Sequence, residues 1–204
     1  NNYVSYAFSL TVATTLAMTL SNYYYFHKYK NKSNSETSNS EKVKIISIEG
    51  NIGSSQSKFV KILQTLFKDK VYFAPEPVGE WLELKDENDV NLLENFYLDK
   101  KRWSYSFQNY AYISRMCEIQ KAKDSGHKII ITERSIQTDK NIFAKMLYDE
   151  GDLNKMEYQM YNKWFYAFNN IETVNVYLKT SVDNCNDRIK KRNRQGESSI
   201  EKDY

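Results

Sequence analysis

Cysteine, proline and histidine occur only twice each in these 204 residues, and glycine only six times. Cys117 and Cys185 lie far apart and match no metal-ligand spacing, so we expect two ordinary buried thiols in a reducing compartment. His27 and His127 are too few to build a histidine-based metal site. A large excess of either charge is also missing, because the net charge is +3, and we therefore expect no nucleic-acid partner.

Charge is absent from residues 3–26, whose many apolar side chains are diluted by threonine and serine. The run is long enough to cross a bilayer as a helix, and aromatic residues gather at both of its ends, as they do at membrane interfaces. Lys28, Lys30 and Lys32 follow, which by the positive-inside bias places the rest of the chain on a cytosolic or matrix-like side. We expect a transmembrane helix over residues 1–27; a cleaved targeting segment and a buried amphipathic helix are the alternatives.

Residues 28–42 are polar and predict a flexible linker, whereas residues 43–204 are enough for one domain with a sizeable core. In this domain, apolar runs typical of buried strands alternate with segments of helical periodicity. Strands are expected at residues 43–48, 71–74, 128–132 and 174–178, and helices after the first strand and within residues 92–123, 139–148, 155–168 and 183–191. This alternation predicts an α/β fold with a parallel sheet and flanking helices, in which ligands bind at the carboxyl ends of the strands.

A degenerate phosphate-binding loop joins the first strand to the first helix. Residues 44–57 read KIISIEGNIGSSQS, and Gly50, Gly53 and Ser57 fall where the short form of this loop, G-x-x-G-x-G-K-S, requires them. Ser55 replaces a glycine and Gln56 replaces the lysine. Backbone N–H groups can still hold phosphate oxygens, and Ser57 can still bind magnesium, but losing one preorganised donor costs about 2.7–4 kcal/mol in the transition state. The predicted phosphate-binding residues here are Gly50, Asn51, Ile52, Gly53, Ser54, Ser55, Gln56 and Ser57.

Acidic residues follow the second and third strands. Glu76 lies between two prolines and can accept a proton from a hydroxyl group; a proline-rigidified turn with solvated acids is the alternative. Glu133 can bind a metal ion, and Arg134 can pair with a phosphate or a carboxylate. A capping salt bridge is the alternative there. Taken alone, the sequence around Glu76 and around Glu133 does not decide between the functional and the structural interpretation.

A basic run, RIKKRNRQGE, contains Arg188, Arg192 and Arg194. Arginines on a mobile lid can close over the phosphates of a nucleotide, since a guanidinium pairs with two phosphate oxygens at once. The more common alternative is a basic helix end in contact with solvent. The run therefore indicates a lid only if the other motifs also form a nucleotide site.

The motifs together resemble the deoxyribonucleoside kinase family. Their order along the chain is GNIGSSQS, EPVGEW, NLLENFYLD, RWSYSFQNYAYISR, ERSIQTDKNIFA and RIKKRNRQGE, and the resemblance extends from about residue 44 to residue 204. It implies a P-loop nucleoside-kinase-like sheet, in which Glu76 takes the proton of the nucleoside 5′-hydroxyl. Glu133 and Arg134 match the residues that serve magnesium and the reacting phosphate. The resemblance also implies that Ser57 and Glu133 hold magnesium when a nucleotide is bound, and that the three arginines of the basic run contact its phosphates.

The resemblance also implies a pocket for the nucleoside. Its predicted residues are Trp81, Tyr97, Phe107, Gln108, Arg115, Asp139, Phe143 and Glu197. Gln108 matches a glutamine that reads the base, and Tyr97 and Glu197 match residues that hold the sugar 3′-hydroxyl. Arg115 and Asp139 match a pair that contacts the base edge in the deoxycytidine and deoxyguanosine type of member. Trp81, Phe107 and Phe143 match the apolar walls.

Two departures from the family pattern are the changed loop and the expected absence of a fifth strand and final helix, either because the C-terminus is cut short here or because this member has dispensed with them. The changed loop and the predicted span favour a membrane-anchored, inactive accessory subunit of a larger membrane complex, such as the respiratory chain or an ATP synthase assembly. A kinase-like subunit of mitochondrial complex I is the precedent, which places the domain on the matrix side of the inner membrane. A viral or other cellular membrane is the alternative location. Two alternative functions also stay open: an active ATP-dependent deoxynucleoside kinase that phosphorylates the 5′-hydroxyl, and a protein that binds a magnesium-nucleotide or nucleoside without turnover.

Overall fold

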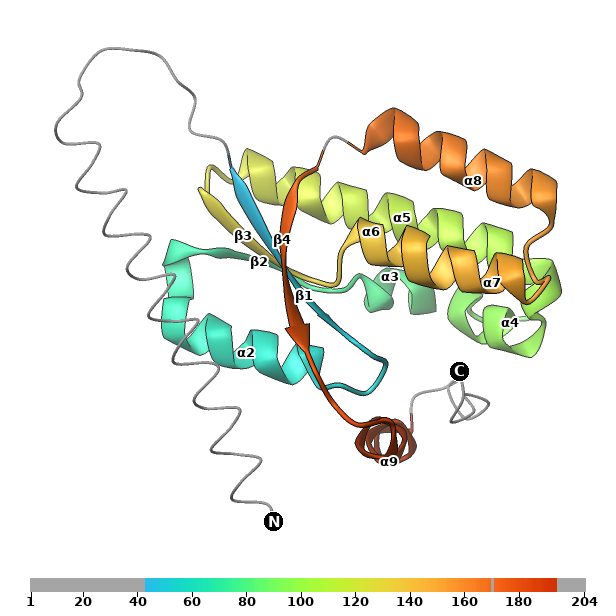
Figure 1. Cartoon of the computed structure of the whole chain (residues 1–204), viewed down its shortest axis with the longest axis horizontal. Helices are drawn as coiled ribbons and strands as arrows, with labels where there is room; N and C mark the ends of the chain where they lie inside the picture. The colour runs from blue at the N-terminus through green and yellow to red at the C-terminus, as the bar shows by residue number, and fades with distance from the viewer. Residues whose placement is uncertain (1–42, 170, 194–204) are drawn as a thin grey trace, which may run out of the picture.

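The computed structural model describes residues 43–169 and 171–193. Within this part of the chain, four parallel strands form one sheet in the order β2-β3-β1-β4 (Figure 1). The strands are β1 (Lys44–Gly50), β2 (Tyr72–Ala74), β3 (Ile129–Glu133) and β4 (Thr173–Leu178). The predicted α/β fold with a parallel sheet and flanking helices is confirmed. The central strands β1 and β3 are the most apolar, as expected for strands that are covered on both faces.

Helices cover both faces of the sheet (Figure 1). One face carries α2 (Gln56–Phe67), and the other carries the long helix α5 (Lys100–Asp124) with α8 (Lys155–Phe168) beside it. The side chains of β1 alternate between two cores, because Ile45 packs on the α5 side and Ile46 and Ile48 pack on the α2 side. The remaining helical elements are η1 (Lys68–Lys70), α3 (Val78–Glu83), α4 (Leu92–Leu98), α6 (Ile136–Thr138), η2 (Asp139–Ala144), α7 (Lys145–Asp149) and α9 (Val182–Arg192).

The helix α2, which follows the phosphate loop, packs on the sheet through one apolar face. Its residues Phe59, Leu63 and Phe67 are buried, and their spacing of four places them on one face of the helix. Leu66 fits the same apolar pattern in the sequence but is 52% exposed. The buried face is therefore narrower than the sequence pattern predicts.

The predicted helical region 92–123 is divided into α4 and α5 at Asp99. The carboxylate of Asp99 accepts a hydrogen bond from the backbone N–H of Arg102 at 3.0 Å, so it caps the start of α5. Asn91 caps α4 in the same way, accepting from the N–H of Glu94 at 2.9 Å. Side chains of both α4 and α5 line one cavity.

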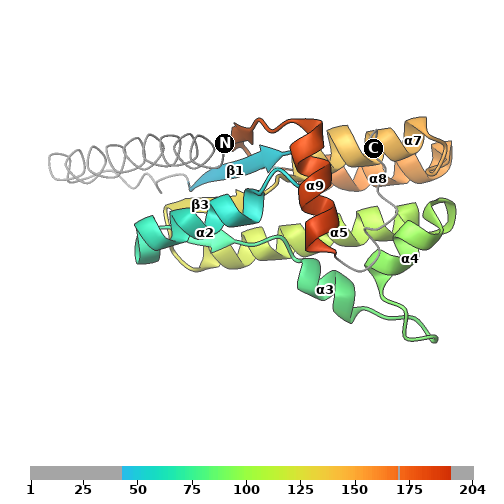
Figure 2. The same cartoon turned by 90° about the horizontal axis from the view of Figure 1, so that it is seen from below.

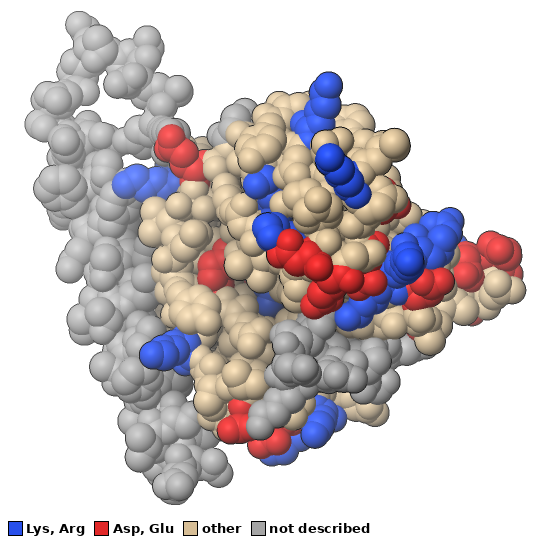
Figure 3. Space-filling view, turned by 45° about the vertical axis from the view of Figure 1, so that its right-hand side comes forward, with Lys and Arg blue, Asp and Glu red and all other residues tan. Residues whose placement is uncertain are grey.

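Several predictions fall outside the described residues: the membrane span at residues 1–27, the linker at residues 28–42, and the site residues Arg194 and Glu197. Among residues 43–169 and 171–193, no helix has the length and apolar character that a membrane span needs. The prediction of two buried thiols is wrong for Cys117, which is exposed because it lies on the outer side of α5; Cys185 is buried. On the face in Figure 3, basic and acidic side chains are intermixed, without a wide field of one sign.

Candidate functional site

A cavity opens at the carboxyl ends of β1, β2 and β3, the edge at which parallel sheets of this class bind ligands. It encloses about 810 Å³ of empty space, part of which is open solvent. Most of its lining comes from three places: the loop between β1 and α2 with the first turn of α2, the helix α4, and the inner face of α5. The cavity therefore collects residues that lie far apart in the sequence.

The loop between β1 and α2 has the compact form that its two glycines allow. A Cβ atom at Gly50 would lie 2.4 Å from the Ser54 hydroxyl oxygen. Gly53 has φ +78°, and a Cβ atom there would lie 2.4 Å from the backbone carbonyl oxygen of Cys185 on α9, so this position requires glycine. Figure 2 shows α9 crossing the end of the sheet beside this loop. Ser55 adopts the left-handed conformation, with φ 74°, at the position where the family pattern has glycine, which costs roughly 1–2 kcal/mol for a residue with a Cβ atom.

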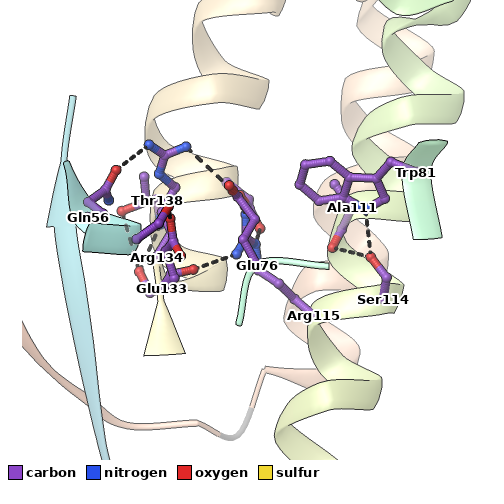
Figure 4. Close-up of polar contacts among 12 residues, drawn as sticks. Gln56, Glu76, Trp81, Ala111, Ser114, Arg115, Glu133, Arg134 and Thr138 are labelled. Atoms are coloured by element: carbon purple, nitrogen blue, oxygen red, sulfur yellow. Dashed lines mark hydrogen bonds and ion pairs between the residues drawn. The ribbon is translucent and has the colours of Figure 1, made fainter. Parts of the chain in front are cut away.

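Gln56 is built into the site although it replaces the lysine. Its side chain is buried and uses both ends of its amide. The Nε2 group donates to the carbonyl oxygen of Ile48 at 3.0 Å, and Oε1 accepts from Nη2 of Arg134 at 2.8 Å (Figure 4). Sequence reasoning identified the loss of charge at this position but not the contact with Arg134, which joins residues that are 78 positions apart.

Arg134 lies between the phosphate loop and Glu76 (Figure 4). Its backbone is left-handed, with φ 71°, and its N–H donates to the carbonyl of Ile48 at 3.1 Å. Besides its bond to Gln56, the guanidinium has Nη1 3.7 Å from Glu76 Oε1 and its Cζ 5.0 Å from the centre of the Phe143 ring. The guanidinium of Arg134 faces the cavity and contacts two of its other lining residues, Gln56 and Glu76.

Glu76, Arg115 and Asp139 form a buried ionic cluster. Arg115 Nη2 lies 2.7 Å from Glu76 Oε1, and its Nε lies 2.7 Å from Asp139 Oδ2. Burial opposes the charged guanidinium, but the charges of Asp139 and Glu76 outweigh that effect and raise the pKa of Arg115. Burial raises the pKa of Asp139, and the charge of Arg115 offsets part of this rise. The alternative of solvated acids at Glu76 is wrong, because its side chain is only 15% exposed and is paired with Arg115.

Ser57 and Glu133 bring two oxygen ligands together. The Ser57 hydroxyl donates to Glu133 Oε1 at 2.5 Å, and burial raises the pKa of Glu133 while this hydrogen bond lowers it in part. Hydroxyl and carboxylate oxygens suit magnesium, which normally takes its other ligands from water and phosphate. The pair therefore fits the predicted magnesium site. Within the part of the chain that the structure describes, no group of three or more His, Cys, Asp or Glu side chains could hold a metal ion.

The other end of the cavity is apolar with one amide. Phe107 meets Trp81 edge-on, with ring centres 5.2 Å apart, and stacks on Phe96 at 4.5 Å. Gln108 is 4% exposed, and its Oε1 has no hydrogen-bond partner within the described part of the chain. A buried unpaired carbonyl oxygen beside flat aromatic walls can accept a hydrogen bond from a planar polar ligand.

A short π-helical segment, η2, brings Asp139 and Phe143 to the same cavity. Such segments insert one extra residue into a helical turn and occur frequently at functional sites. Asp139 thereby reaches Arg115 on α5, whereas Phe143, four positions later, lies under the guanidinium of Arg134. The two ends of the cavity are thus connected through one element.

Most predicted site residues line this cavity. They are Ile52, Gly53, Ser55, Gln56, Ser57, Glu76, Trp81, Tyr97, Phe107, Gln108, Arg115, Glu133, Arg134, Asp139, Phe143 and Arg192. Gly50, Asn51, Ser54 and Arg188 lie in neighbouring positions but do not line it; Arg188 Nη1 instead donates to the carbonyl of Gly53 at 3.4 Å.

Three lining residues were missed by the sequence analysis: Leu93, Phe96 and Ala111. Ala111 could have been found from helical spacing, since it lies three positions after Gln108 and four before Arg115 on α5. Phe96 lies next to the predicted Tyr97 but gives no separate signal in the sequence.

Comparison with known proteins gives a consistent result. The family model described as deoxynucleoside kinase matches residues 46–204. The chain is 34% identical over 187 residues to deoxycytidine kinase of Homo sapiens, with 80% of this chain and 71% of the relative covered. It is 37% identical over 169 residues to a protein of Fowlpox virus (strain NVSL) named probable deoxycytidine kinase, with 80% and 68% covered. It is 32% identical over 184 residues to the mitochondrial deoxyguanosine kinase of Xenopus laevis, with 80% and 69% covered.

Proposed function

Because the chain belongs to the deoxynucleoside kinase family, we propose that it binds a deoxynucleoside in this cavity and transfers a phosphoryl group from a nucleotide to its 5′-hydroxyl. One observation carries the proposal. Glu76 Oε1 is 2.7 Å from Arg115, on the aromatic side of the cavity, and 3.7 Å from Arg134, on the phosphate-loop side. A carboxylate at that junction is in the right place to accept a proton as phosphate arrives.

The acceptor end fits a deoxycytidine or a deoxyguanosine. The flat walls of Trp81, Phe96 and Phe107 suit a base ring, and the free Oε1 of Gln108 suits a donor group on its edge. Asp139, held by Arg115, offers a second acceptor for an exocyclic amine. These base classes also agree with the names of the relatives, which are kinases for deoxycytidine and deoxyguanosine.

In the proposed reaction the 5′-oxygen attacks the terminal phosphorus of the donor, the bond from that phosphorus to the bridging oxygen breaks, and the hydroxyl proton passes to Glu76. The nucleoside diphosphate is the leaving group. The backbone N–H groups at the start of α2 and the guanidinium of Arg134 stabilise the charge on the phosphate oxygens. A magnesium ion held by Ser57 and Glu133 would neutralise part of the donor's charge.

A second candidate function is binding of a deoxynucleoside or nucleotide without turnover. Gln56 favours it, since an amide supplies no charge where the loop pattern has a lysine. A membrane-anchored subunit of a larger complex, including one in the mitochondrial inner membrane, stays a proposal that rests on residues 3–26 of the sequence alone.

Two measurements on the same samples test the proposal. Calorimetry with deoxycytidine, deoxyguanosine and thymidine measures binding, and transfer from magnesium-ATP to each nucleoside measures the reaction. We expect deoxycytidine or deoxyguanosine to bind and to be phosphorylated. In Glu76→Gln, transfer should fall by about 10²- to 10⁴-fold while nucleoside binding stays within a few-fold.

The outcomes separate the candidates. Binding without transfer by the native chain would favour the second candidate. If none of the three nucleosides binds to a sample that melts cooperatively, the proposal is wrong.

A further inference from the structure

The amide of Gln56 makes two hydrogen bonds that a lysine cannot both make. Its Nε2 donates to the Ile48 carbonyl at 3.0 Å, and its Oε1 accepts from Arg134 at 2.8 Å. An ammonium group has donors only, so a lysine at this position could keep the bond to Ile48 but not the bond to Arg134. The contact with Arg134 therefore depends on the residue that breaks the loop pattern.

The same contact determines where the guanidinium of Arg134 lies. The Nη2 group that donates to Gln56 is also 3.4 Å from the carbonyl of Gly50, at the start of the phosphate loop. The ring of Phe143 supports the guanidinium, with its centre 5.0 Å from Cζ. Arg134 thus brings a permanent positive charge from the end of β3 to the loop that has none at position 56.

We propose that Gln56 is a positioning residue, which holds Arg134 against the phosphate loop so that the guanidinium supplies the charge that the loop itself lacks. The inference rests on the proposed phosphoryl transfer. A guanidinium suits this task because its planar fork can pair with two phosphate oxygens. In this model Gln56 acts together with Arg134, and the replacement of the lysine is more than a loss of charge.

The proposal predicts that the effect of restoring the lysine depends on Arg134. Gln56→Lys adds the missing charge but removes the acceptor of Arg134, so part of the gain in transfer is lost in the native background. In a background without the guanidinium nothing is lost, and the gain should be larger. If Gln56 did not position Arg134, the gain should be the same in both backgrounds.

A two-by-two set of variants separates these two models. It comprises the native chain, Gln56→Lys, Arg134→Gln, and the exchange variant Gln56→Lys/Arg134→Gln. We expect Gln56→Lys to raise kcat at least fivefold more in the Arg134→Gln background than in the native background, because only there does the change cost no contact with Arg134. Equal gains in the two backgrounds would overturn the proposal.

Further readouts exclude a merely structural role for Gln56. Gln56→Met keeps the approximate volume but removes both hydrogen bonds, so we expect it to lower kcat at least tenfold and to raise KM for ATP, with KM for the nucleoside changed less than about twofold. Its melting temperature identifies any loss of folded protein. If the fall in kcat is fully explained by a smaller fraction of folded protein, the proposal is wrong.

One measurement does not depend on turnover. Inorganic tripolyphosphate, titrated by calorimetry, should bind at least fivefold more weakly to Gln56→Met than to the native chain, because Arg134 is no longer held at the loop. If the native chain binds deoxycytidine but transfers no phosphate, the proposed reaction fails, and tripolyphosphate binding alone decides the role of Gln56. Equal affinities of the two proteins would then overturn it.

Discussion

Ser57 and Glu133 join the first turn of α2 to the end of β3 through a hydrogen bond of 2.5 Å. The two residues come from elements that lie side by side only because β1 and β3 are neighbours in the sheet. Their contact holds one carboxylate oxygen where the loop faces the cavity. The protonation state of that carboxylate therefore influences both the stability of the fold and its capacity for magnesium.

The pH dependence of stability should report on Glu133. Burial raises its folded-state pKa, so the protonated form stabilises the fold below the unfolded-state pKa, and this contribution is lost as the pH rises through the folded-state pKa. Glu133→Gln cannot lose that contribution. We expect the melting temperature of Glu133→Gln, relative to that of the native chain, to increase as the pH is raised from about 4 to 8.

A matched variant tests the cause. Ser57→Ala removes the hydrogen bond that favours the ionised carboxylate, so its melting temperature should fall more steeply with rising pH than that of the native chain. Parallel curves for the native chain and Glu133→Gln would show that Glu133 does not titrate in this way.

Removing Arg115 should destabilise the fold strongly. Its side chain is 6% exposed and is paired with Glu76 and Asp139, so Arg115→Met leaves two buried carboxylates without their cation. We expect a loss of about 3–5 kcal/mol in the free energy of unfolding, measured with urea. Arg115→Met/Asp139→Asn should recover part of that loss, because one buried charge is removed with its partner; an equally large loss in both variants would contradict the pairing.

Gln108→Leu should separate stability from binding. The Oε1 atom of Gln108 is buried without a partner in the described residues, so an apolar side chain of similar volume should leave the melting temperature equal or higher. Nucleoside affinity should fall by about 5- to 150-fold, since the donor on the ligand is left without a partner in a buried site, which costs about 1–3 kcal/mol. Gln137, whose Nε2 bonds to Ile171 outside the cavity, gives the control: Gln137→Leu should leave nucleoside affinity unchanged.

Ser55→Gly should stabilise the loop. Ser55 has φ 74°, which glycine adopts without the steric penalty of a Cβ atom. We expect a net gain of about 0.5–1 kcal/mol in the free energy of unfolding, because the higher entropy of glycine in the unfolded chain offsets part of the relief. Ser55→Ala is the control, since it removes the hydroxyl but keeps the Cβ atom, and an equal gain in that variant would assign the effect to the hydroxyl.

The fold was predictable because its strongest signals are local. Apolar runs such as residues 43–48 can be stable only in a covered strand, and the loop pattern that follows requires a strand before it and a helix after it. The sequence allows one or two helices over residues 92–123, but it does not predict a division at Asp99, since Asp99 acts as a cap only when its side chain turns back to the N–H of Arg102. The exposure of Leu66 and of Cys117 depends on which neighbours reach each helix, and a single sequence does not contain that information.

The site was predictable as a set of residues but not as a set of contacts. Glu76, Arg115 and Arg134 could be named from the order of the motifs, yet nothing in the sequence indicates that Glu76 lies against both arginines. The role of Gln56 was missed for a similar reason. A replaced lysine reads as a loss in the sequence, whereas the new hydrogen bond becomes visible only when β1 and β3 are placed side by side.

The two cysteines allow local opening near the contact between α9 and the phosphate loop to be followed by thiol labelling. Cys185 lies where α9 touches Gly53, and its thiol is buried with a pKa raised by that burial, whereas the thiol of Cys117 is exposed. A thiol reagent should therefore modify Cys117 at once and Cys185 only as often as a local opening around α9 exposes it. The ratio of the two labelling rates measures that opening in the native protein without an added reporter group.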